Sequence, residues 1–268
     1  MSTAVCSSGL DRRVPESFGV PGWFLPALAS AILVLGCAHK ADLKQAEAHY
    51  KLGYSFLIDQ QLQPAFVEFQ KAVEKNPDDR DTHYALAHVY FLQQNFSEAE
   101  RELKRVLKID DRDAKAWNYL GMVYDAQGRT DLALQQFDHA LSLPQYATPE
   151  FAHYNKGRVY LKKGLTDDAL QAFVLAVRIN PKQPYALAAY EAGKLYLDRG
   201  AVKEAIEVFR LAAQQVPNAP EAHLYLAKAY ARGGMNKDAR ESYQKVIELA
   251  PDSRWAEEAR TQMAQPKR

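Results

Sequence analysis

Cysteine is scarce in this chain of 268 residues: there are two, Cys6 and Cys37, and none follows position 37. Two thiols supply neither a disulfide framework nor a four-thiolate zinc site. An excess of one charge is also missing, since 34 basic and 33 acidic side chains leave a formal net charge of +1. A chain balanced in this way lacks the broad positive surface of a nucleic-acid-binding protein, so we expect no nucleic-acid partner.

Residues 1–36 are predicted to be an export signal. Their polar start ends in two arginines, and no Asp, Glu, Lys or Arg lies between Ser17 and Ala38. The apolar core from Trp23 to Leu35 would be about 20 Å long as a helix, which is shorter than the roughly 30 Å hydrocarbon core of a bilayer. A basic start followed by a short apolar run and small residues is typical of a secretory signal.

The end of this segment, Leu33-Val34-Leu35-Gly36-Cys37, resembles the lipobox of bacterial lipoproteins. The resemblance implies cleavage before Cys37, a diacylglycerol on its thiol and an acyl chain such as palmitate on its amine. This covalent lipid would anchor the protein to the membrane, and we expect no other cofactor. Ala38 favours the outer membrane, with 37–45 as a short linker to a periplasmic domain. Two alternatives remain: an uncleaved anchor interrupted by proline, and ordinary cleavage at 29–31, which would leave an exposed apolar tail.

The body of the chain, residues 46–253, repeats with a period of about 34 residues. We divide it into units 46–79, 80–113, 114–147, 150–183, 186–219 and 220–253. The twentieth position is alanine in every unit: Ala65, Ala99, Ala133, Ala169, Ala205 and Ala239. The eighth position is always Gly or Ala, and the twenty-fourth is Phe, Leu or Tyr. Small residues at positions eight and twenty predict two helices in close contact, with large apolar residues filling the space around them.

This pattern resembles the tetratricopeptide repeat, and the third unit matches most of its signature with Trp117, Leu120, Gly121, Tyr124, Ala133, Phe137 and Ala140. The resemblance implies an all-α fold, a right-handed superhelical solenoid of six helix pairs. Proline at position thirty-two ends the second helix of four units, because it has no N–H to donate. Asp111 and Gln145 replace it in the second and third units. We therefore expect a looser exit, that is, a less sharply defined end of the second helix, in these two units. Residues 254–264, after Asp252-Ser253, are predicted to form a capping helix.

We expect neither a metal site nor enzymatic activity. Four of the seven histidines share the fourth position of different units: His49, His83, His153 and His223. Along a solenoid most of them would lie tens of ångströms apart, whereas metal ligands must all lie about 2 Å from one ion. A packing role is therefore expected for them. No glycine-rich phosphate loop and no strand pattern is found.

The tetratricopeptide resemblance implies that certain positions of each first helix line a concave surface. We expect this surface to bind a partner protein and not a small-molecule substrate. The candidate residues are Tyr50, Tyr54, Leu57, Ile58, Tyr84, His88, Phe91, Leu92, Tyr154, Arg158, Lys194 and Lys228. They predict a groove that changes from apolar near the membrane to basic at the far end. Alternatively, the tyrosines at position five pack between neighbouring first helices. The Lys/Asn carboxylate clamp of chaperone-binding members is not matched.

Six repeats behind a lipobox resemble the type IV pilus biogenesis and stability lipoproteins, the pilotins that help an outer-membrane secretin insert and multimerise. The most specific local match is residues 143–150, which contain the extra dipeptide Thr148-Pro149. The resemblance implies a non-enzymatic outer-membrane scaffold that assists secretin assembly. The alternatives are a tetratricopeptide scaffold lipoprotein in outer-membrane protein assembly and an accessory to polysaccharide export.

Cys37→Ser is expected to release the folded protein from the outer membrane. One acyl chain binds a bilayer only marginally, with a constant of about 10⁴ M⁻¹, whereas two or three hold a protein durably. Membrane fractionation measures the release. Mass spectrometry of the wild-type protein should detect the lipid, and a wild-type protein without it would contradict the anchor.

Overall fold

The computed structural model describes residues 24–179 and 186–264, which form thirteen helices and no strand. The helices are α1 (Phe24–Ile58), α2 (Leu62–Lys75), α3 (Arg80–Leu92), α4 (Phe96–Ile109), α5 (Ala114–Ala126), α6 (Thr130–Ser142), α7 (Pro149–Lys162), α8 (Thr166–Arg178), α9 (Ala186–Asp198), α10 (Val202–Gln215), α11 (Pro220–Arg232), α12 (Asn236–Leu249) and α13 (Arg254–Ala264). The first 23 residues of the predicted export signal, Pro181 and the dipeptide Pro184-Tyr185 lie outside the described residues.

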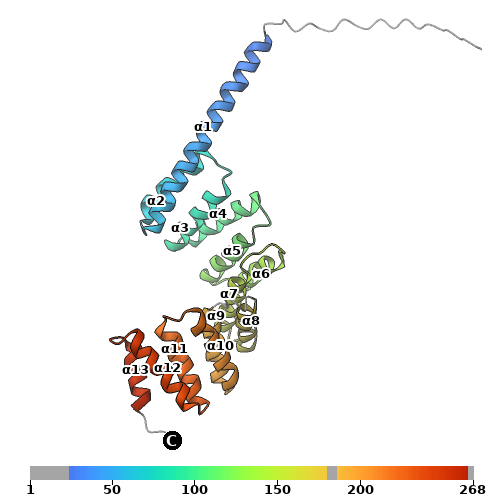
Figure 1. Ribbon diagram of the computed structural model, residues 1–268. Coiled ribbons are helices and arrows are strands. Elements are labelled where there is room, and N and C mark those ends of the chain that lie inside the picture. The colour runs from blue at the N-terminus through green and yellow to red at the C-terminus, as the bar shows by residue number, and fades with distance from the viewer. Residues whose placement is uncertain (1–23, 180–185, 265–268) are drawn as a thin grey trace, which may run out of the picture.

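The helices pair in sequence order, and each pair packs mainly against the next one (Figure 1). The pairs run from α1/α2 to α11/α12 along a curved stack, and α13 packs on both α11 and α12. Ser253 caps α13, because its Oγ accepts a hydrogen bond from the N–H of Ala256 at 3.3 Å. The predicted all-α solenoid of six helix pairs with a capping helix is confirmed.

Helix α1 is much longer than the helix expected for the first unit. It begins at Phe24 and continues without interruption to Ile58, so residues 37–45 are helical. In Figure 1 its N-terminal part projects away from the stack of pairs. Among the described residues, no helix combines the length and the apolar character that crossing a bilayer requires.

The two helices of each unit meet where position twenty-four packs on position eight. Phe69, Phe137, Phe173 and Phe209 occupy position twenty-four and are fully buried. Each phenyl ring lies on the glycine at position eight of its own unit, where an added Cβ would come within 2.5–2.8 Å of ring carbon atoms. In the second and sixth units position eight is alanine, and position twenty-four is Leu103 or Tyr243 instead of Phe. In the second unit the larger residue at position eight is therefore matched by a smaller one at position twenty-four, whereas the sixth unit accommodates Ala227 together with Tyr243.

The turn inside each unit requires a residue with a left-handed backbone conformation (positive φ) at position fifteen. This residue is Gly128, Gly164, Gly200 or Gly234 in the last four units, with φ between 72° and 77°. In the first two units it is Gln60 and Gln94, with φ of 59° and 60°. A side chain at positive φ costs of order 1 kcal/mol or more. The first two turns are therefore more strained than the other four.

Four of the six second helices end at the same repeat position whether or not proline follows, and α6 and α8, of the third and fourth units, end one residue earlier. Helices α2, α4, α10 and α12 all end two residues before position thirty-two, although this position is Asp111 in the second unit. The looser end expected for the second helix of the second unit was therefore wrong. A ring nitrogen at position four of the next unit holds the exit by donating a hydrogen bond to the carbonyl at position thirty-two. These bonds are Trp117 Nε1 to Asp111 at 2.8 Å, His83 Nε2 to Pro77 at 2.8 Å and His223 Nε2 to Pro217 at 2.9 Å.

Gly157→Ala is expected to lower the free energy of unfolding by roughly 1 kcal/mol. The new Cβ would lie 2.5 Å from Cε1 of Phe173, and overpacking costs about 1–3 kcal/mol, partly offset by the better helix propensity of alanine. The double variant Gly157→Ala/Phe173→Leu reproduces the Ala87/Leu103 pair of the second unit. In urea unfolding it should lose less stability than the two single variants together, whereas strictly additive losses would contradict the matched contact.

Candidate partner-binding surface

The twelve residues assigned to the concave surface differ in exposure, and none is fully buried. Arg158 and three apolar residues are exposed; Tyr54, Ile58 and Leu92 have exposed fractions of 50%, 66% and 46%. The other eight are half-buried: Tyr50, Leu57, Tyr84, His88, Phe91, Tyr154, Lys194 and Lys228. The three exposed apolar residues lie on α1 and α3, the first helices of the first two units. The open apolar part of the surface is therefore at the N-terminal end of the stack.

Aromatic side chains of the second unit pack around Tyr119 of α5. The ring centroids of Tyr84 and Phe91 each lie 5.5 Å from that of Tyr119, and the centroid of His88 lies 6.0 Å from it. Tyr119 itself is only 8% exposed. Burial raises the pKa of Tyr84 to about 12. These side chains join the second unit to the third, so less of their surface is open to a partner than the sequence indicates.

The connection between the third and fourth units, which contains the extra dipeptide Thr148-Pro149, adds a further ring to this cluster. Tyr146, in the connection between α6 and α7, is 9% exposed and belongs to the same buried cluster as Tyr119. Burial is the main cause of the raised pKa of Tyr146, and the neighbouring Tyr84 adds to it. The end of the third unit therefore has a structural role, because it supplies a side chain to the interior where these units meet.

Neighbouring first helices meet repeatedly at one pair of positions, five of one unit and six of the next. The pairs are Tyr84 with Tyr119, Asn118 with Asn155, and Tyr190 with Tyr225. Asn155 Nδ2 donates to Asn118 Oδ1 at 3.1 Å, and the ring centroids of Tyr190 and Tyr225 are 4.4 Å apart. At Tyr84 and Tyr190, therefore, the tyrosine at position five does pack between neighbouring first helices.

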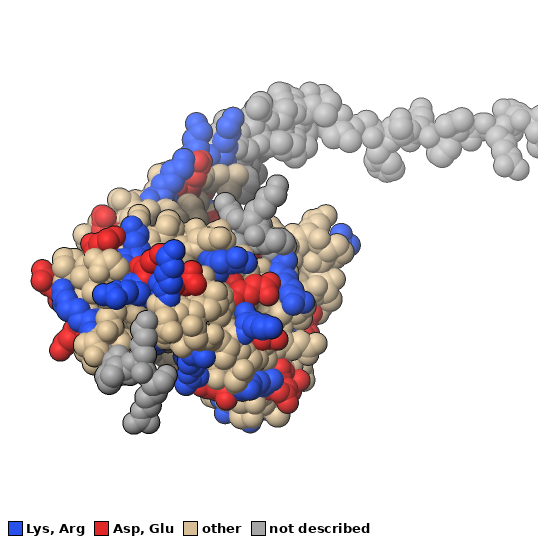
Figure 2. All heavy atoms as spheres, turned by 60° about the horizontal axis from the view of Figure 1, so that its bottom comes forward, with Lys and Arg blue, Asp and Glu red and all other residues tan. Residues whose placement is uncertain are grey.

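Basic side chains in the C-terminal half of the surface have carboxylate partners nearby. Lys162 Nζ lies 2.6 Å from a carboxylate oxygen of Asp125 on the preceding unit, and Lys194 Nζ lies 3.1 Å from Glu191. Figure 2 shows Lys and Arg interspersed with Asp and Glu over the face that it presents. The positive charge expected at this end of the groove is thus partly neutralised.

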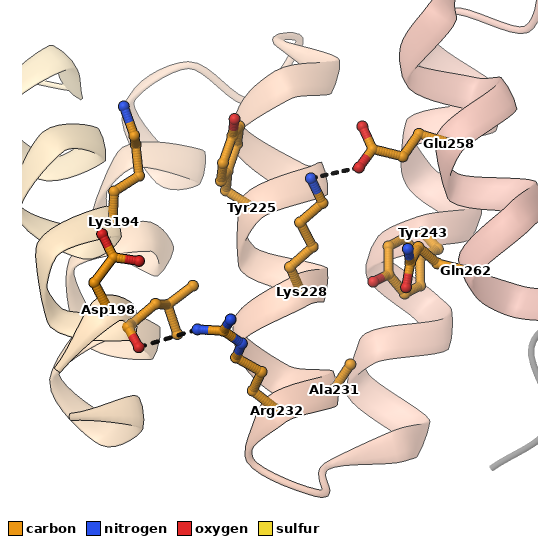
Figure 3. A pocket seen from close by; sticks show the side chains of 10 residues that line it. Lys194, Asp198, Tyr225, Lys228, Ala231, Arg232, Tyr243, Glu258 and Gln262 are labelled. Carbon is orange, nitrogen blue, oxygen red and sulfur yellow. Dashed lines mark hydrogen bonds and ion pairs between the residues drawn. The ribbon is translucent and has the colours of Figure 1, made fainter. Parts of the chain in front are cut away.

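A cleft of about 570 Å³ lies between α9, α11 and α13 (Figure 3). Lys228 of α11 and Glu258 of α13 point toward each other, with 2.6 Å between Nζ and Oε1. Arg232 Nη1 donates to the backbone carbonyl of Leu197 at 3.0 Å and so joins α11 to α9. The ring of Tyr225 also lines the cleft, and Lys228 Nζ lies 4.8 Å from its centroid. The cleft therefore combines an aromatic ring with several charged groups, and the capping helix forms one of its sides.

Comparison with known families agrees with this geometry. Sequence profiles described as tetratricopeptide repeat match residues 56–123 and 196–262, 154–220 and 114–143. The chain belongs to the tetratricopeptide repeat family. A curated relative, the tetratricopeptide repeat-containing protein trd-1 of Caenorhabditis elegans, is 25% identical over 101 residues. The match covers 38% of this chain and 13% of the worm protein, so it spans a small part of that protein's length.

Several solved tetratricopeptide structures are similar over most of this chain. PilF of Pseudomonas aeruginosa has a TM-score of 0.67 and 23% identity, covering 83% of this chain and 99% of PilF. PilW, described as a widely conserved type IV pilus biogenesis factor, has a TM-score of 0.64 and 20% identity, covering 80% and 97% of the two chains. YrrB, described as having an unusual peptide-binding site, has a TM-score of 0.51 and 24% identity, covering 72% and 97%. At these identities the similarity establishes the fold alone.

The histidines at position four of the tetratricopeptide units contact carboxylates and carbonyls. His83 is buried, and its Nδ1 lies 2.6 Å from Glu102 Oε2 at position twenty-three of the same unit. His49 and Glu68 form the equivalent contact in the first unit, also at 2.6 Å. Among the described residues, no three His, Cys, Asp or Glu side chains are grouped as a metal site would require.

The pKa values of His83 and Glu102 shift in opposite directions. Burial disfavours the charged form of His83, but its hydrogen bonds to Glu102 and to the carbonyl of Pro77 outweigh this effect, and its pKa is raised. Burial likewise disfavours the charged carboxylate of Glu102, but the bond to His83 and the charge of Arg105 leave its pKa lowered. Both groups are therefore stabilised in their charged forms.

The His83–Glu102 pair is expected to stabilise the fold most in weakly acidic solution. The contribution of Glu102 is complete above the ordinary pKa of 4.5 and is lost as the pH falls through its lowered pKa. The contribution of His83 is complete below the ordinary pKa of 6.5 and is lost as the pH rises through its raised pKa. Urea unfolding at a series of pH values should therefore give the largest difference between wild type and His83→Gln between pH 4.5 and 6.5.

The control for this measurement is His223→Gln. His223 makes the same hydrogen bond to a carbonyl, that of Pro217, but the structure records no carboxylate contact for it among the described residues. A difference between wild type and His83→Gln that did not change with pH would contradict the charged pair.

Sequence reasoning missed three residues of these sites: Tyr119, Tyr225 and Glu258. Tyr119 and Tyr225 both occupy position six, so the repeat itself carried a signal that could have identified them. Glu258 gave no such signal, because it lies on the capping helix outside the repeat. Its contact with Lys228 is seen only when α13 is packed against α11.

Proposed function

We propose that this chain is a non-enzymatic lipoprotein scaffold that binds a partner protein and assists assembly of a type IV pilus secretin in the outer membrane. The observation that carries the proposal is the extent of the similarity to PilF and PilW. At least 97% of each of those chains is covered, as is at least 80% of this one. A solenoid of similar fold and length offers a comparable surface to a partner. PilW is described as a pilus biogenesis factor.

The lipid anchor would attach directly to the repeat domain through α1. Cys37 and the whole first helix of the first unit belong to this one helix. Ala46 lies nine positions after Cys37, which corresponds to about 14 Å at 1.5 Å per residue. A lipidated Cys37 would therefore hold the first helix pair close to the bilayer, where an outer-membrane partner is within reach.

The exposed apolar residues Tyr54, Ile58 and Leu92 are the proposed docking surface for that partner. Large apolar side chains that remain exposed in a folded protein often mark interaction sites. Tyr54 and Ile58 are four residues apart on one face of α1, and Leu92 occupies the repeat position of Ile58 in the next unit. This arrangement suits an amphipathic helix of the partner, which can bury apolar anchors while its polar side faces water.

Deletion of the gene tests the cellular role. We expect heat- and detergent-resistant secretin multimers to be lost while total outer-membrane porins stay unchanged. Loss of porins as well would favour the alternative of a scaffold in outer-membrane protein assembly. Unchanged secretin multimers would overturn the proposal.

Tyr54→Ala/Ile58→Ala is expected to weaken partner binding about thirtyfold or more, because truncating a central anchor typically costs about 2 kcal/mol. Pull-down from solubilised outer membranes, followed by titration with the purified partner, measures the effect. The control is Val67→Ala/Leu175→Ala, which truncates exposed apolar residues on the second helices α2 and α8. Both double variants should keep the wild-type melting curve, and equal binding by both would show that the surface on α1 is not used.

A further inference from the structure

The cleft of Figure 3 is formed by α9, α11 and α13, and these helices lie at the opposite end of the stack from α1, which carries Tyr54 and Ile58 (Figure 1). We propose that this cleft is a second binding site, which takes an acidic, extended segment of a partner protein through the side-chain carboxylates of that segment. Lys194, Lys228 and Arg232 would bind these carboxylates. The inference does not rest on the pilus role, because it follows from the charges and contacts of the cleft alone.

The lining of the cleft contains more positive than negative charge. Three cationic side chains line it, against the two carboxylates Asp198 and Glu258, although Lys194 is also paired with Glu191 beside the cleft. Arg232 Nη1 is bonded to a neutral backbone carbonyl, that of Leu197, and within the described parts of the chain no carboxylate is recorded at ion-pair distance from it. A guanidinium placed in this way retains donors that can bind a carboxylate.

Glu258 shows where a ligand carboxylate would sit. It is the only carboxylate recorded within ion-pair distance of Lys228 among the described residues, and it comes from the capping helix and not from the repeat units. The ring of Tyr225 fixes the other side of Lys228, since the ammonium lies 4.8 Å from the ring centroid. The chain thus already contains one carboxylate bound in the cleft, with Lys228 held between it and an aromatic ring.

The shape of the cleft favours an extended segment. Its volume of about 570 Å³ lies within the range of roughly 300–1,000 Å³ that is usual for ligand sites. The cations come from two neighbouring first helices, Lys194 from α9 and Lys228 and Arg232 from α11 (Figure 3). Leu197 and Ala231 add apolar lining between the charged groups. Several acidic residues in a row could contact such a site at once, which a single small anion cannot do.

If a ligand carboxylate binds Lys228, it competes with Glu258 for the same ammonium. Removing the internal carboxylate should therefore strengthen ligand binding, whereas removing a cation should weaken it. The capping helix itself remains packed after a change at Glu258, because it is held by the fully buried Ala256 and Ala259. These opposite effects distinguish a specific site from general attraction between opposite charges.

The experiment is a fluorescence-anisotropy titration of the full-length protein with a short amidated peptide rich in Asp and Glu. A peptide with Asn and Gln at the same places is the ligand control. Lys194→Gln/Arg232→Gln should weaken binding roughly tenfold, since each exposed charge contact is worth up to about fivefold. Glu258→Gln should tighten binding several-fold. Lys203→Gln removes an exposed cation on α10 outside the cleft and should change affinity by less than twofold.

Melting curves of all variants are recorded first, so that a loss of folding is not mistaken for a loss of the site. The proposal is overturned if the acidic peptide shows no saturable binding, if Lys203→Gln weakens binding as much as the cleft variants, or if Glu258→Gln weakens it. Sedimentation velocity tests whether a second copy of this chain occupies the cleft instead. A dimer of this chain that Lys194→Gln/Arg232→Gln abolishes and the acidic peptide does not disrupt would assign the cleft to a second copy.

Discussion

Every unit of the solenoid depends on the contact of a side chain at position twenty-four with the small residue at position eight. This contact sets the distance between the two helices of the unit, because in four units the phenyl ring leaves no room for a Cβ. Each pair then presents the next one with a surface of nearly the same shape. The regular stack, and with it the concave surface, follows from this repeated contact.

The fold could be predicted because its determinants recur in the sequence. Alanine at position twenty, a small residue at position eight and a large apolar residue at position twenty-four are visible without coordinates. Contacts between distant segments were not visible in this way. Tyr146 enters the cluster around Tyr119 from the end of the third unit, at a repeat position that is polar in the other five units, so no periodic rule places it there. The unbroken α1 was also missed, since the apolar composition of an export signal does not reveal where a helix begins.

The positions of the candidate-site residues on the first helices could be predicted, but the exposure of their side chains could not. Repeat register assigned Tyr84 and Tyr54 to the same surface, yet Tyr84 packs against Tyr119 while half of Tyr54 is open to solvent. The ring beside Tyr84 comes from position six of the next unit, whereas the ring recorded beside Tyr54, that of Tyr50, belongs to its own unit. Exposure in a solenoid is thus decided by the next repeat along the chain.

The hydrogen bonds between position four and the preceding unit have a mechanical consequence. They tie the second unit to the first, the third to the second and the sixth to the fifth. The fifth unit has Ala189 at this position, which has no side-chain donor, so its junction with the fourth unit lacks this tie. The side-chain ties between neighbouring units are therefore unevenly distributed along the solenoid, and bending at a junction without one breaks no such bond. Such bending would change the angle between the apolar surface and the cleft without deforming either of them. A partner bound at one site would then change the orientation of a partner bound at the other.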